Sequence, residues 1–364
     1  MTKILYISAD WGTGRDGEPT PGGSCFYRVV QPAEALARNG IETMVVKHFS
    51  YDSTTGEILG RPDADADPVG GFDIVVFQRW MRESGAVLTE RAQAYGQIVV
   101  QDIDDWHWGL DTDHTAFNAT HPKASPTANR NHYWRTLARA DLITVSTDYL
   151  AARLAKLNVP TVVVPNAIDL SRYADQPVRD TERPVVGWVG GVPWRSRDLQ
   201  ILQGVLGPYM VRHGLSFIHG GHVPAAPRAA DLLGLRPETP TTERLMVPVS
   251  EYPSLFEGID LFIAPLADTP FNLAKSSIKL LEASASGIPW VASDIGPYRS
   301  SQGGRLARRP KDWQRHLEVL IDPSERALQR ATQLEWASTY SIDRLWTNWV
   351  NAYKTISGVD LAVT

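Results

Sequence analysis

Residues 271–293 read FNLAKSSIKLLEASASGIPWVAS, and the organisation of the chain is clearest from this stretch. Its first part predicts a short helix over about 274–286, which Gly287 and the proline that follows bring to an end. A strand over 290–293 comes next, so the stretch predicts a helix that leads into a buried strand. One face of the helix is apolar at a spacing that suits packing against a sheet, and it consists of Ile278, Leu281 and Ala285.

The other face of this predicted helix carries charge. Lys275, Lys279 and Glu282 are spaced i, i+4 and i+7, which places all three on one face. A helix N-terminus with two lysines in its first turns favours an anion. A nucleoside diphosphate fits this pattern, with phosphates at the lysines and ribose hydroxyls at Glu282. An ordinary solvated face with a Lys–Glu pair would show the same pattern, so this stretch alone leaves both interpretations open.

Length and composition predict a globular protein of two domains. The chain has 364 residues, of which 43% are hydrophobic and 21% are charged. The net charge of −5 argues against stable binding of nucleic acid, because the phosphate backbone repels an acidic surface. The only cysteine is Cys25, which excludes an internal disulfide, and no Cys/His cluster in the sequence suggests structural zinc.

The N-terminus predicts a cytoplasmic protein. Met1–Lys3 runs directly into the apolar segment Ile4–Ile7, and the polar residues Ser8–Asp10 follow. This pattern is typical of a first strand and not of a signal peptide. No apolar run approaches the ~20 residues that span a membrane, so contact with a membrane is expected to be peripheral at most.

Short apolar segments alternate with helical segments in both halves of the chain. In the first half, strands are expected at 3–8, 42–49, 72–78, 97–103, 142–145 and 161–164. In the second half, strands are expected at 184–189, 215–218, 245–248, 260–264 and 289–292. A polar segment at 167–183 separates the halves and predicts a linker. The alternation predicts an α/β protein with a parallel sheet in each half, covered by helices on both sides.

The loops that follow these strands are candidate sites, because parallel α/β sheets bind ligands at the carboxyl ends of their strands. Gly22-Gly23 ends a long loop after the first strand, and Gly190-Gly191 directly follows the strand at 184–189. Glycines allow a backbone to approach a phosphate closely. Residues 104–108 (DDWHW) follow the strand at 97–103 and are candidates for the same reason.

Several landmarks in fixed order carry a resemblance to a known family. They are Gly22-Gly23, residues 142–150 (LITVSTDYL), residues 164–169 (VPNAID), Gly190-Gly191 with Arg195 and Arg197, and the block 271–298. In this order and spacing, the chain resembles retaining glycosyltransferases of the GT-B fold and is similar to the family-four group. The resemblance covers most of the chain.

The resemblance implies two Rossmann-like domains with parallel sheets that face a central cleft. Residues 1–167, with a C-terminal helix at 341–358 that crosses back to them, would form the acceptor domain. Residues 168–340 would form the donor domain. The implied reaction moves a sugar from a nucleoside-diphosphate sugar to an acceptor hydroxyl, with retention and without a metal. The nucleotide sugar is then a substrate, and no cofactor is expected.

Candidate site residues follow from the resemblance and from charge. Without a metal, cations must neutralise the leaving diphosphate, and the family places a histidine against the donor sugar. The catalytic candidates are His107, Arg195, Arg197 and Lys279. The donor-binding candidates are Gly22, Gly23, Gly190, Gly191, Asn272, Lys275, Ser276 and Glu282, with backbone amides at 272–276 as further donors. The acceptor-side candidates are Arg28, Asp104, Asp105 and Trp108.

One position departs from the family's pattern. Much of the family has two glutamates eight positions apart in this block, and Glu282 matches the second while Ala274 stands at the first. The missing carboxylate motivates one alternative, a catalytically silent protein that binds sugar nucleotides. Two others are a GT-B-fold epimerase that acts on a sugar nucleotide alone and an inverting transferase. The donor's base and sugar, and the identity of the acceptor, stay open.

Overall fold

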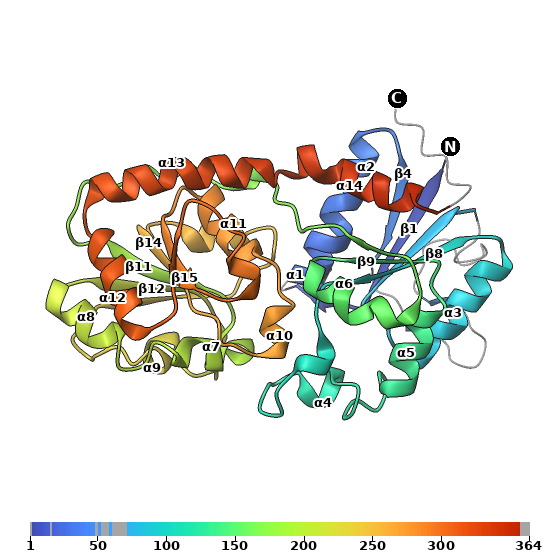
Figure 1. Ribbon diagram of the computed structural model, residues 1–364, viewed down its shortest axis with the longest axis horizontal. Coiled ribbons are helices and arrows are strands. Elements are labelled where there is room, and N and C mark those ends of the chain that lie inside the picture. The colour runs from blue at the N-terminus through green and yellow to red at the C-terminus, as the bar shows by residue number, and fades with distance from the viewer. Residues whose placement is uncertain (1, 15–16, 48–49, 52–57, 60–70, 357–364) are drawn as a thin grey trace. The chain divides into compact units, whose positions relative to one another are not determined.

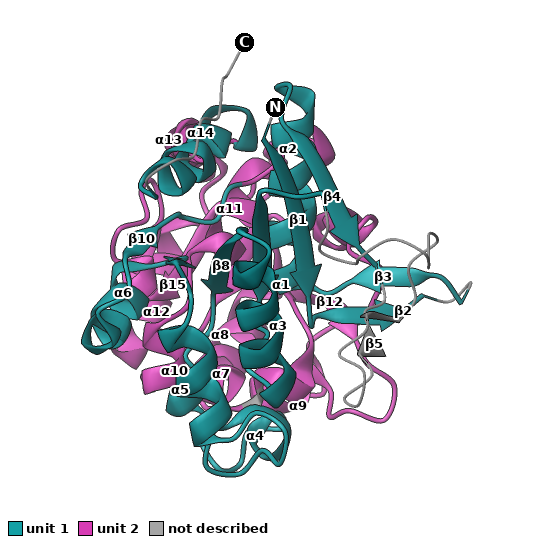
Figure 2. Cartoon of the chain, turned by 90° about the vertical axis from the view of Figure 1, so that its right-hand side faces the viewer, with its two compact units in different colours: residues 1–167, 342–364 teal, residues 168–341 magenta. Residues whose placement is uncertain are grey.

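The computed structural model describes residues 2–14, 17–47, 50–51, 58–59 and 71–356, and the chain divides into two compact units. Unit 1 comprises Met1–Ala167 and Ile342–Thr364, and unit 2 comprises Ile168–Ser341. Figure 2 colours the two units separately. The sequence places the domain boundary at residue 167, and the first unit boundary falls after Ala167.

Unit 1 is built on a parallel six-stranded sheet in the order β10-β9-β8-β7-β1-β4. Its strands are β1 Lys3–Ser8, β4 Glu42–Val46, β7 Ile74–Gln78, β8 Ile98–Ile103, β9 Leu142–Val145 and β10 Thr161–Val163. The strands β1, β7, β8 and β9 are buried almost throughout, which explains why their sequences are mostly apolar. The strand predicted at 42–49 is confirmed over 42–46, and residues 48–49 lie outside the described residues.

The helices of unit 1 include the C-terminal helix of the chain. They are α1 Gly23–Cys25, the π-helical segment η1 Phe26–Val30, α2 Gln31–Arg38, α3 Glu83–Ala94, α4 Phe117–Thr120, α5 Arg130–Ala138, α6 Asp148–Leu154 and α14 Ile342–Lys354, with the 3-10 turns η2 His107–Gly109 and η3 Ala155–Leu157. Two antiparallel hairpins pair β2 Trp11–Thr13 with β3 Pro19–Pro21, and β5 Ser50–Tyr51 with β6 Ile58–Leu59. The C-terminal helix predicted at 341–358 ends at Lys354, and residues 357–358 lie outside the described residues.

The helix α14 is held in the core of unit 1 by aromatic side chains. Trp349 and Tyr353 are buried in the same cluster as Tyr6 of β1. The Tyr6 and Tyr353 hydroxyl oxygens lie 3.0 Å apart and share a hydrogen bond. Replacement of a buried aromatic by alanine commonly costs about 3–5 kcal/mol, so these contacts fix the helix firmly to residues more than three hundred positions away.

Unit 2 contains a second six-stranded sheet in the order β13-β12-β11-β14-β15-β16, and all its pairings are parallel. Its strands are β11 Val185–Val189, β12 Ser216–His222, β13 Thr241–Leu245, β14 Leu261–Ala264, β15 Trp290–Ser293 and β16 Arg305–Ala307. Its helices are α7 Ser196–Gln200, α8 Leu206–His213, α9 Ala229–Leu232, α10 Pro270–Leu273, α11 Ile278–Ala285, α12 Pro310–Val319 and α13 Pro323–Thr339. Short 3-10 turns are η4 Leu170–Arg172, η5 Val192–Trp194, η6 Tyr252–Phe256 and η7 Gly296–Tyr298.

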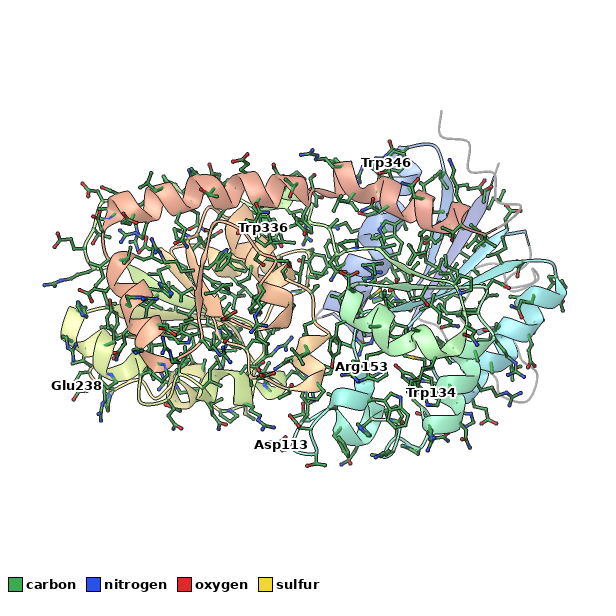
Figure 3. The ribbon with its side chains drawn as sticks, viewed as in Figure 1. Asp113, Trp134, Arg153, Glu238, Trp336 and Trp346 are labelled. Carbon is green, nitrogen blue, oxygen red and sulfur yellow. The ribbon has the colours of Figure 1, made fainter. Side chains whose placement is uncertain are left out.

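Helices cover both faces of the unit 2 sheet (Figure 1). Alternate residues of β14 divide between the two faces: Phe262 belongs to one core cluster, and Leu261 and Ile263 belong to the other. The first cluster includes residues of α11 and α13. Trp336 of α13, labelled in Figure 3, meets Trp290 of β15 edge-on at 6.3 Å. The two-layer covering predicted from the apolar strands is confirmed.

Two expectations for unit 2 differ from the structure in detail. The strand expected at 245–248 lies earlier, at Thr241–Leu245, because these polar residues pair with β12 at the edge of the sheet. The edge strand β16 at Arg305–Ala307 was not expected, because its arginine-rich sequence resembles a solvated loop. Among the described residues, no helix has the length and apolar character needed to cross a membrane.

Each sheet has one point where the strand order changes direction. In unit 1, β4 adds to one side of β1 and β7 adds to the other. In unit 2, β12 and β13 add to one side of β11, and β14 adds to the other. Open α/β sheets bind ligands outside the carboxyl ends of the strands at such a point. The carboxyl ends of β1 and β7, and those of β11 and β14, are therefore the places to examine.

Candidate functional site

The turn after β11 brings backbone and cation into close contact. Gly190 has a φ of 150°, and a Cβ atom there would lie 2.9 Å from the Lys279 ammonium nitrogen. A Cβ atom on Gly191 would lie 2.4 Å from the Trp194 ring. The Gly190 amide donates to the carbonyl oxygen of Gly220 on β12 at 2.8 Å, which anchors the turn to the sheet. Both glycines are therefore required by their surroundings.

Lys279 reaches this turn from the first turn of α11. Its ammonium group donates a hydrogen bond to the carbonyl oxygen of Val189 and lies 5.1 Å from the centre of the Trp188 ring. Burial, followed by the nearby charge of Arg195, lowers the pKa of Lys279 from 10.5 to about 8. The ammonium therefore occupies an environment that lacks enough negative charge, and an added anion would stabilise its charged form.

Arg195 is held beside Lys279 by Asp198. The Arg195 guanidinium lies 3.5 Å from one carboxylate oxygen of Asp198. The other carboxylate oxygen accepts hydrogen bonds from the Asn272 side chain at 2.7 Å and from the Ala267 amide at 2.9 Å. Asn272 also donates to the Ala267 carbonyl oxygen, so both of its amide hydrogens are used within the protein. Asn272 is thus a positioning residue, and Asp198 is a member of the site that the sequence analysis missed.

Of the two arginines predicted here, the structure brings only Arg195 to the site. Its side chain is 23% exposed, whereas Arg197 is exposed on α7. The spacing Arg195-x-x-Asp198 was the available signal, because residues three apart on a helix can pair.

Glu282 lies beneath this cationic group with only 4% of its surface exposed. Its charge helps to raise the pKa of Tyr252 and of Tyr298, although burial is the larger cause for both phenols. The attraction between Glu282 and Lys279 partly opposes the effect of burial on the lysine. The Glu282 carboxylate thus interacts electrostatically with the phenol groups of both tyrosines. The two tyrosines were not predicted as site residues.

The predicted helix at 274–286 is wrong at its start, since α11 begins only at Ile278. Thr269 caps the separate helix α10, and its hydroxyl oxygen accepts the amide of Asn272 at 3.2 Å. The next three amides, up to Lys275, donate to carbonyl oxygens at 269–272. The amides at 272–275 are therefore used within α10 and the turn that follows it, which contradicts their predicted role as phosphate donors; the role of the Ser276 amide stays a prediction.

The break between α10 and α11 also separates Lys275 from Lys279 and Glu282. Lys275 and Ser276 lie between the two helices, and the Lys275 ammonium lies 4.1 Å from the centre of the Phe271 ring. The predicted single face with three charged residues is thus reduced to Lys279 and Glu282. Ala274 is fully buried, so the family's missing carboxylate has no space in this packing.

A second polar cluster lies at the carboxyl ends of β7 and β8 in unit 1. Asp104 and Asp105 face Arg79, with shortest nitrogen–oxygen distances of 3.9 and 3.7 Å. Burial and the adjacent charge of Asp105 raise the pKa of Asp104 to about 6. Arg79 also donates to the Ser24 hydroxyl at 3.0 Å and has a φ of 55°, which is uncommon for a residue with a side chain. Arg79 was missed, because nothing in the apolar strand before it marks an unusual backbone.

His107 joins the same cluster on the turn η2. Its Nε2 atom lies 3.2 Å from an Arg79 nitrogen. Arginine can only donate, so Nε2 accepts this hydrogen bond and carries no proton. In this arrangement His107 presents a lone pair to Arg79, and its predicted catalytic role remains a prediction.

Gly22-Gly23 begins the helix α1, and a carboxylate of the protein already occupies that helix end. Asp10 accepts the amide of Cys25 at 3.0 Å. A Cβ atom on Gly22 would lie 2.4 Å from the Asp10 carboxylate, which explains this glycine. A phosphate bound here would have to displace Asp10 from the Cys25 amide. The Cys25 amide is therefore not available for the donor contact that was predicted for Gly22 and Gly23.

Arg28, predicted on the acceptor side, is instead a fully buried structural residue. It forms a 2.6 Å ion pair with Asp102 and donates to the side-chain oxygen of Asn166 at 3.0 Å. Its guanidinium lies 4.5 Å from the centre of the Trp349 ring, which ties it to α14. The prediction is wrong because the Arg28 guanidinium is paired with the carboxylate of Asp102, 74 positions away, inside the core.

Trp108 was also predicted on the acceptor side, and it stacks at 5.8 Å and 19° on Trp134 of α5, which Figure 3 labels. His121 and Tyr133 meet it edge-on at 5.9 and 6.3 Å. Its aromatic face is thus used in packing the loop after β8. The thiol of Cys25, the single cysteine of the sequence, is buried in the core of unit 1.

Comparison with solved structures identifies the fold. The chain is similar to Anabaena Alr3699/HepE in complex with UDP and glucose, with 14% identity, a TM-score of 0.60 and coverage of 98% of this chain and 100% of that chain. It is similar to a glycosyltransferase from Rickettsia africae ESF-5, with 11% identity, a TM-score of 0.63 and coverage of 99% of both chains. It is also similar to the catalytic domain of Starch Synthase IV from Arabidopsis thaliana bound to ADP and acarbose, with 12% identity, a TM-score of 0.62 and coverage of 97% and 99%. These similarities define the fold as GT-B.

The class of the enzyme follows from unit 2. Residues 183–322 match the family described as glycosyl transferases group 1. No curated protein matches the chain in sequence. The predicted resemblance to GT-B glycosyltransferases is thus confirmed, whereas retention and the family-four grouping stay predictions. The family match together with the GT-B fold identifies the chain as a glycosyltransferase. The matched range contains the Gly190-Gly191 turn, Arg195, Lys279 and Glu282.

Proposed function

We propose that this protein transfers a glycosyl group from a nucleoside-diphosphate sugar to a hydroxyl group of an acceptor. The observation that carries the proposal is the meeting of Lys279, Arg195 and Glu282 beside the Gly190-Gly191 turn, at the strand-order change of unit 2. Two cations beside a closely approachable backbone suit a diphosphate, and a buried carboxylate suits ribose hydroxyls. The UDP and ADP bound by proteins of similar fold support a nucleotide donor.

In this proposal, Lys279 and Arg195 stabilise the leaving diphosphate. Negative charge grows on the phosphate oxygen as the bond to the sugar breaks, and pre-positioned cations lower the energy of that state. The Arg195 guanidinium is oriented by Asp198, which Asn272 and Ala267 hold in turn. Lys279 gains its full charge when the phosphate arrives, because its pKa of about 8 then rises. This role requires no metal at the diphosphate.

We further propose transfer with retention, in which the acceptor hydroxyl attacks the sugar from the side of the leaving group. A phosphate oxygen of the leaving group takes the hydroxyl proton as the new bond forms. The state of Cys25 supports this route over a covalent enzyme intermediate on sulfur, because burial raises the pKa of its thiol to about 12.

Unit 1 supplies the acceptor-side candidates in this proposal. Asp104 and Asp105 are carboxylates that can accept hydrogen bonds from the hydroxyls of an acceptor, and Arg79 orients both. With its pKa of about 6, Asp104 is ionised at neutral pH and loses this ability in mild acid.

The test is a panel of UDP-, GDP- and ADP-sugars, measured for binding and for donor consumption. We expect one base to bind, and Lys279→Ala and Glu282→Gln to weaken binding by about 10-fold to 100-fold, as loss of a charge-assisted hydrogen bond does. Lys311→Ala removes an exposed lysine on α12 and serves as the matched control. The proposal fails if no nucleotide sugar binds, or if Lys311→Ala weakens binding as much as Lys279→Ala.

The same assay separates the second candidate function, a silent binder of sugar nucleotides. The buried Ala274 favours this candidate, because the donor sugar lacks the carboxylate that much of the family provides. Binding without transfer to any acceptor or to water would support it. A changed sugar in the recovered donor would support the epimerase, and the anomeric configuration of the product would distinguish retention from inversion.

A further inference from the structure

Two histidines of β12 and a glutamate of β13 face one another in unit 2, and His219 is the register partner of Glu243. The ligand atoms of His219, His222 and Glu243 all lie within 4.8 Å of one another. The Nδ1 atom of His222 is 3.2 Å from a Glu243 carboxylate oxygen. His219 is fully buried, and the side chains of His222 and Glu243 are 19% and 18% exposed. No motif in the sequence marks this cluster, because Glu243 is distant in sequence from the histidines.

The backbone of β12 is bent so that both histidines point to the same side. Residues three apart on a regular strand point to opposite faces. Here the pairing with β13 shifts between Gly220 and His222, and Gly221 has a φ of 105°. A Cβ atom on Gly221 would lie 3.0 Å from the carbonyl oxygen of Gly190, so this bulge requires glycine. The juxtaposition of the two imidazoles is thus built into the strand.

The proton positions leave a bare nitrogen aimed into this cluster. The Nε2 atom of His219 lies 3.0 Å from the carbonyl oxygen of Gly190, and because a carbonyl only accepts, Nε2 carries the proton. Its Nδ1 atom then holds a lone pair, and this buried atom has no hydrogen-bond partner in the described part of the chain. Metal-binding histidines typically donate their other ring N–H to a backbone carbonyl or a carboxylate in this way.

Glu243 is oriented from outside the cluster. Its second carboxylate oxygen accepts a hydrogen bond from Arg228 at 3.2 Å, and Arg228 also donates to the hydroxyl of Thr241 at 2.9 Å. Although Nδ1 of His222 lies close to the first oxygen, the two atoms are not aligned as a hydrogen bond. The cluster therefore brings together two imidazole rings and one carboxylate, and neither imidazole Nδ1 atom has a hydrogen-bond partner among the described residues.

We propose that Nδ1 of His219, Nδ1 of His222 and a carboxylate oxygen of Glu243 bind one divalent transition-metal ion, with Zn²⁺ as the best fit. Two imidazoles and one carboxylate are a zinc ligand set, whereas Ca²⁺ and Mg²⁺ prefer oxygen ligands alone. Tetrahedral bonds of about 2.1 Å place ligand atoms ~3.4 Å apart. The His222–Glu243 separation already matches this spacing, and rotation of the half-buried His222 and Glu243 side chains brings the rest of the set inward.

A metal here would position the turn of the donor site without touching the donor. Fixing the His219 ring fixes the Nε2–H that holds the carbonyl oxygen of Gly190. Gly190 in turn lies next to the Lys279 ammonium group, because a Cβ atom on Gly190 would be 2.9 Å from its nitrogen. The inference departs from the expectation of a metal-free protein, yet it stands apart from the proposed function, because metal binding is measured without any nucleotide sugar.

The test is a Zn²⁺ titration of the full-length, tag-free, chelator-treated protein against a chromogenic chelator. We expect one Zn²⁺ per chain and a melting temperature that rises with Zn²⁺ concentration, because a ligand of the native state stabilises it. Co²⁺ should give the visible spectrum of a tetrahedral site. His222→Ala and Glu243→Gln should each weaken Zn²⁺ binding by at least about 100-fold, since even outer partners of metal ligands contribute about 10-fold to 100-fold.

The matched control is His213→Ala, because His213 at the end of α8 pairs with Glu318 of α12 and lies outside the cluster. This variant should bind Zn²⁺ like the parent protein. The melting temperatures of the metal-free variants show whether each is folded, and either cluster variant suffices. Less than one Zn²⁺ bound per chain at tenfold excess would overturn the proposal, as would equal loss of binding in His213→Ala.

Discussion

The affinity for a sugar nucleotide should depend on the protonation of Lys279. Its ammonium is buried beside Arg195, and its pKa falls from 10.5 to about 8. The diphosphate of a sugar nucleotide keeps its full charge between pH 7 and pH 9, so the lysine dominates the pH dependence of binding in that range. Only the charged lysine pairs with the diphosphate, and deprotonation therefore weakens binding.

The magnitude follows from the pKa. With a pKa of about 8, roughly nine-tenths of the lysine is charged at pH 7 and roughly one-tenth at pH 9, so the dissociation constant should rise about tenfold. The low pKa also has a consequence for stability. The folded state binds fewer protons than the unfolded state between pH 8 and pH 10.5, so the ligand-free protein should become more stable as pH rises through that window. The full effect corresponds to roughly 3 kcal/mol, at 1.36 kcal/mol per pH unit.

The assay is calorimetric titration with the best nucleotide sugar at pH 7, 8 and 9. Lys279→Arg keeps its charge at all three pH values and should show no loss of affinity with pH. Lys279→Met should bind weakly at every pH, while its ligand-free melting temperature stays equal to that of the parent or exceeds it. A tenfold loss of affinity between pH 7 and pH 9 that persists in Lys279→Arg would refute this reasoning, because another group would then be responsible.

Three further predictions concern other parts of the structure. Gly190→Ala should weaken donor binding about tenfold or more, measured by the same calorimetry, because its backbone is strained for alanine and the new Cβ displaces Lys279. Arg28→Ala should cost about 3–5 kcal/mol of stability by leaving Asp102 unpaired and buried, seen as a fall of roughly 10 °C in melting temperature, with donor affinity retained at 15 °C. In the parent, transfer should fall in acid with a midpoint near pH 6, as Asp104 becomes protonated, and Asp104→Asn should abolish this acid limb; an unchanged limb would exclude Asp104 as its origin.

Much of the fold was predictable because its strands are short apolar runs with both faces buried. The strand at 97–103 and the strand at 260–264 needed only this pattern and the turn residues around them. The position of the donor-site candidates was also predictable, since Gly190-Gly191 directly follows a strand and parallel sheets bind ligands there.

The remaining features depend on contacts between distant residues, which spacing does not reveal. The helix expected over 274–286 breaks because Asn272 bonds to Asp198, 74 positions away, and because Thr269 caps a separate helical turn. Arg28 is withdrawn from the surface by Asp102, and no local pattern marks that pair. The His219–His222 cluster depends on a strand bulge, which places two side chains on the same side against the regular alternation.

An experimental structure of the protein with its nucleotide sugar tests the central claim most directly. We expect diphosphate oxygens within about 3 Å of the Lys279 ammonium and the Arg195 guanidinium, with ribose hydroxyls on Glu282. A diphosphate bound instead at Lys275 and Arg197, with Lys279 still bonded to Val189 and Glu282 without ligand contact, would contradict it.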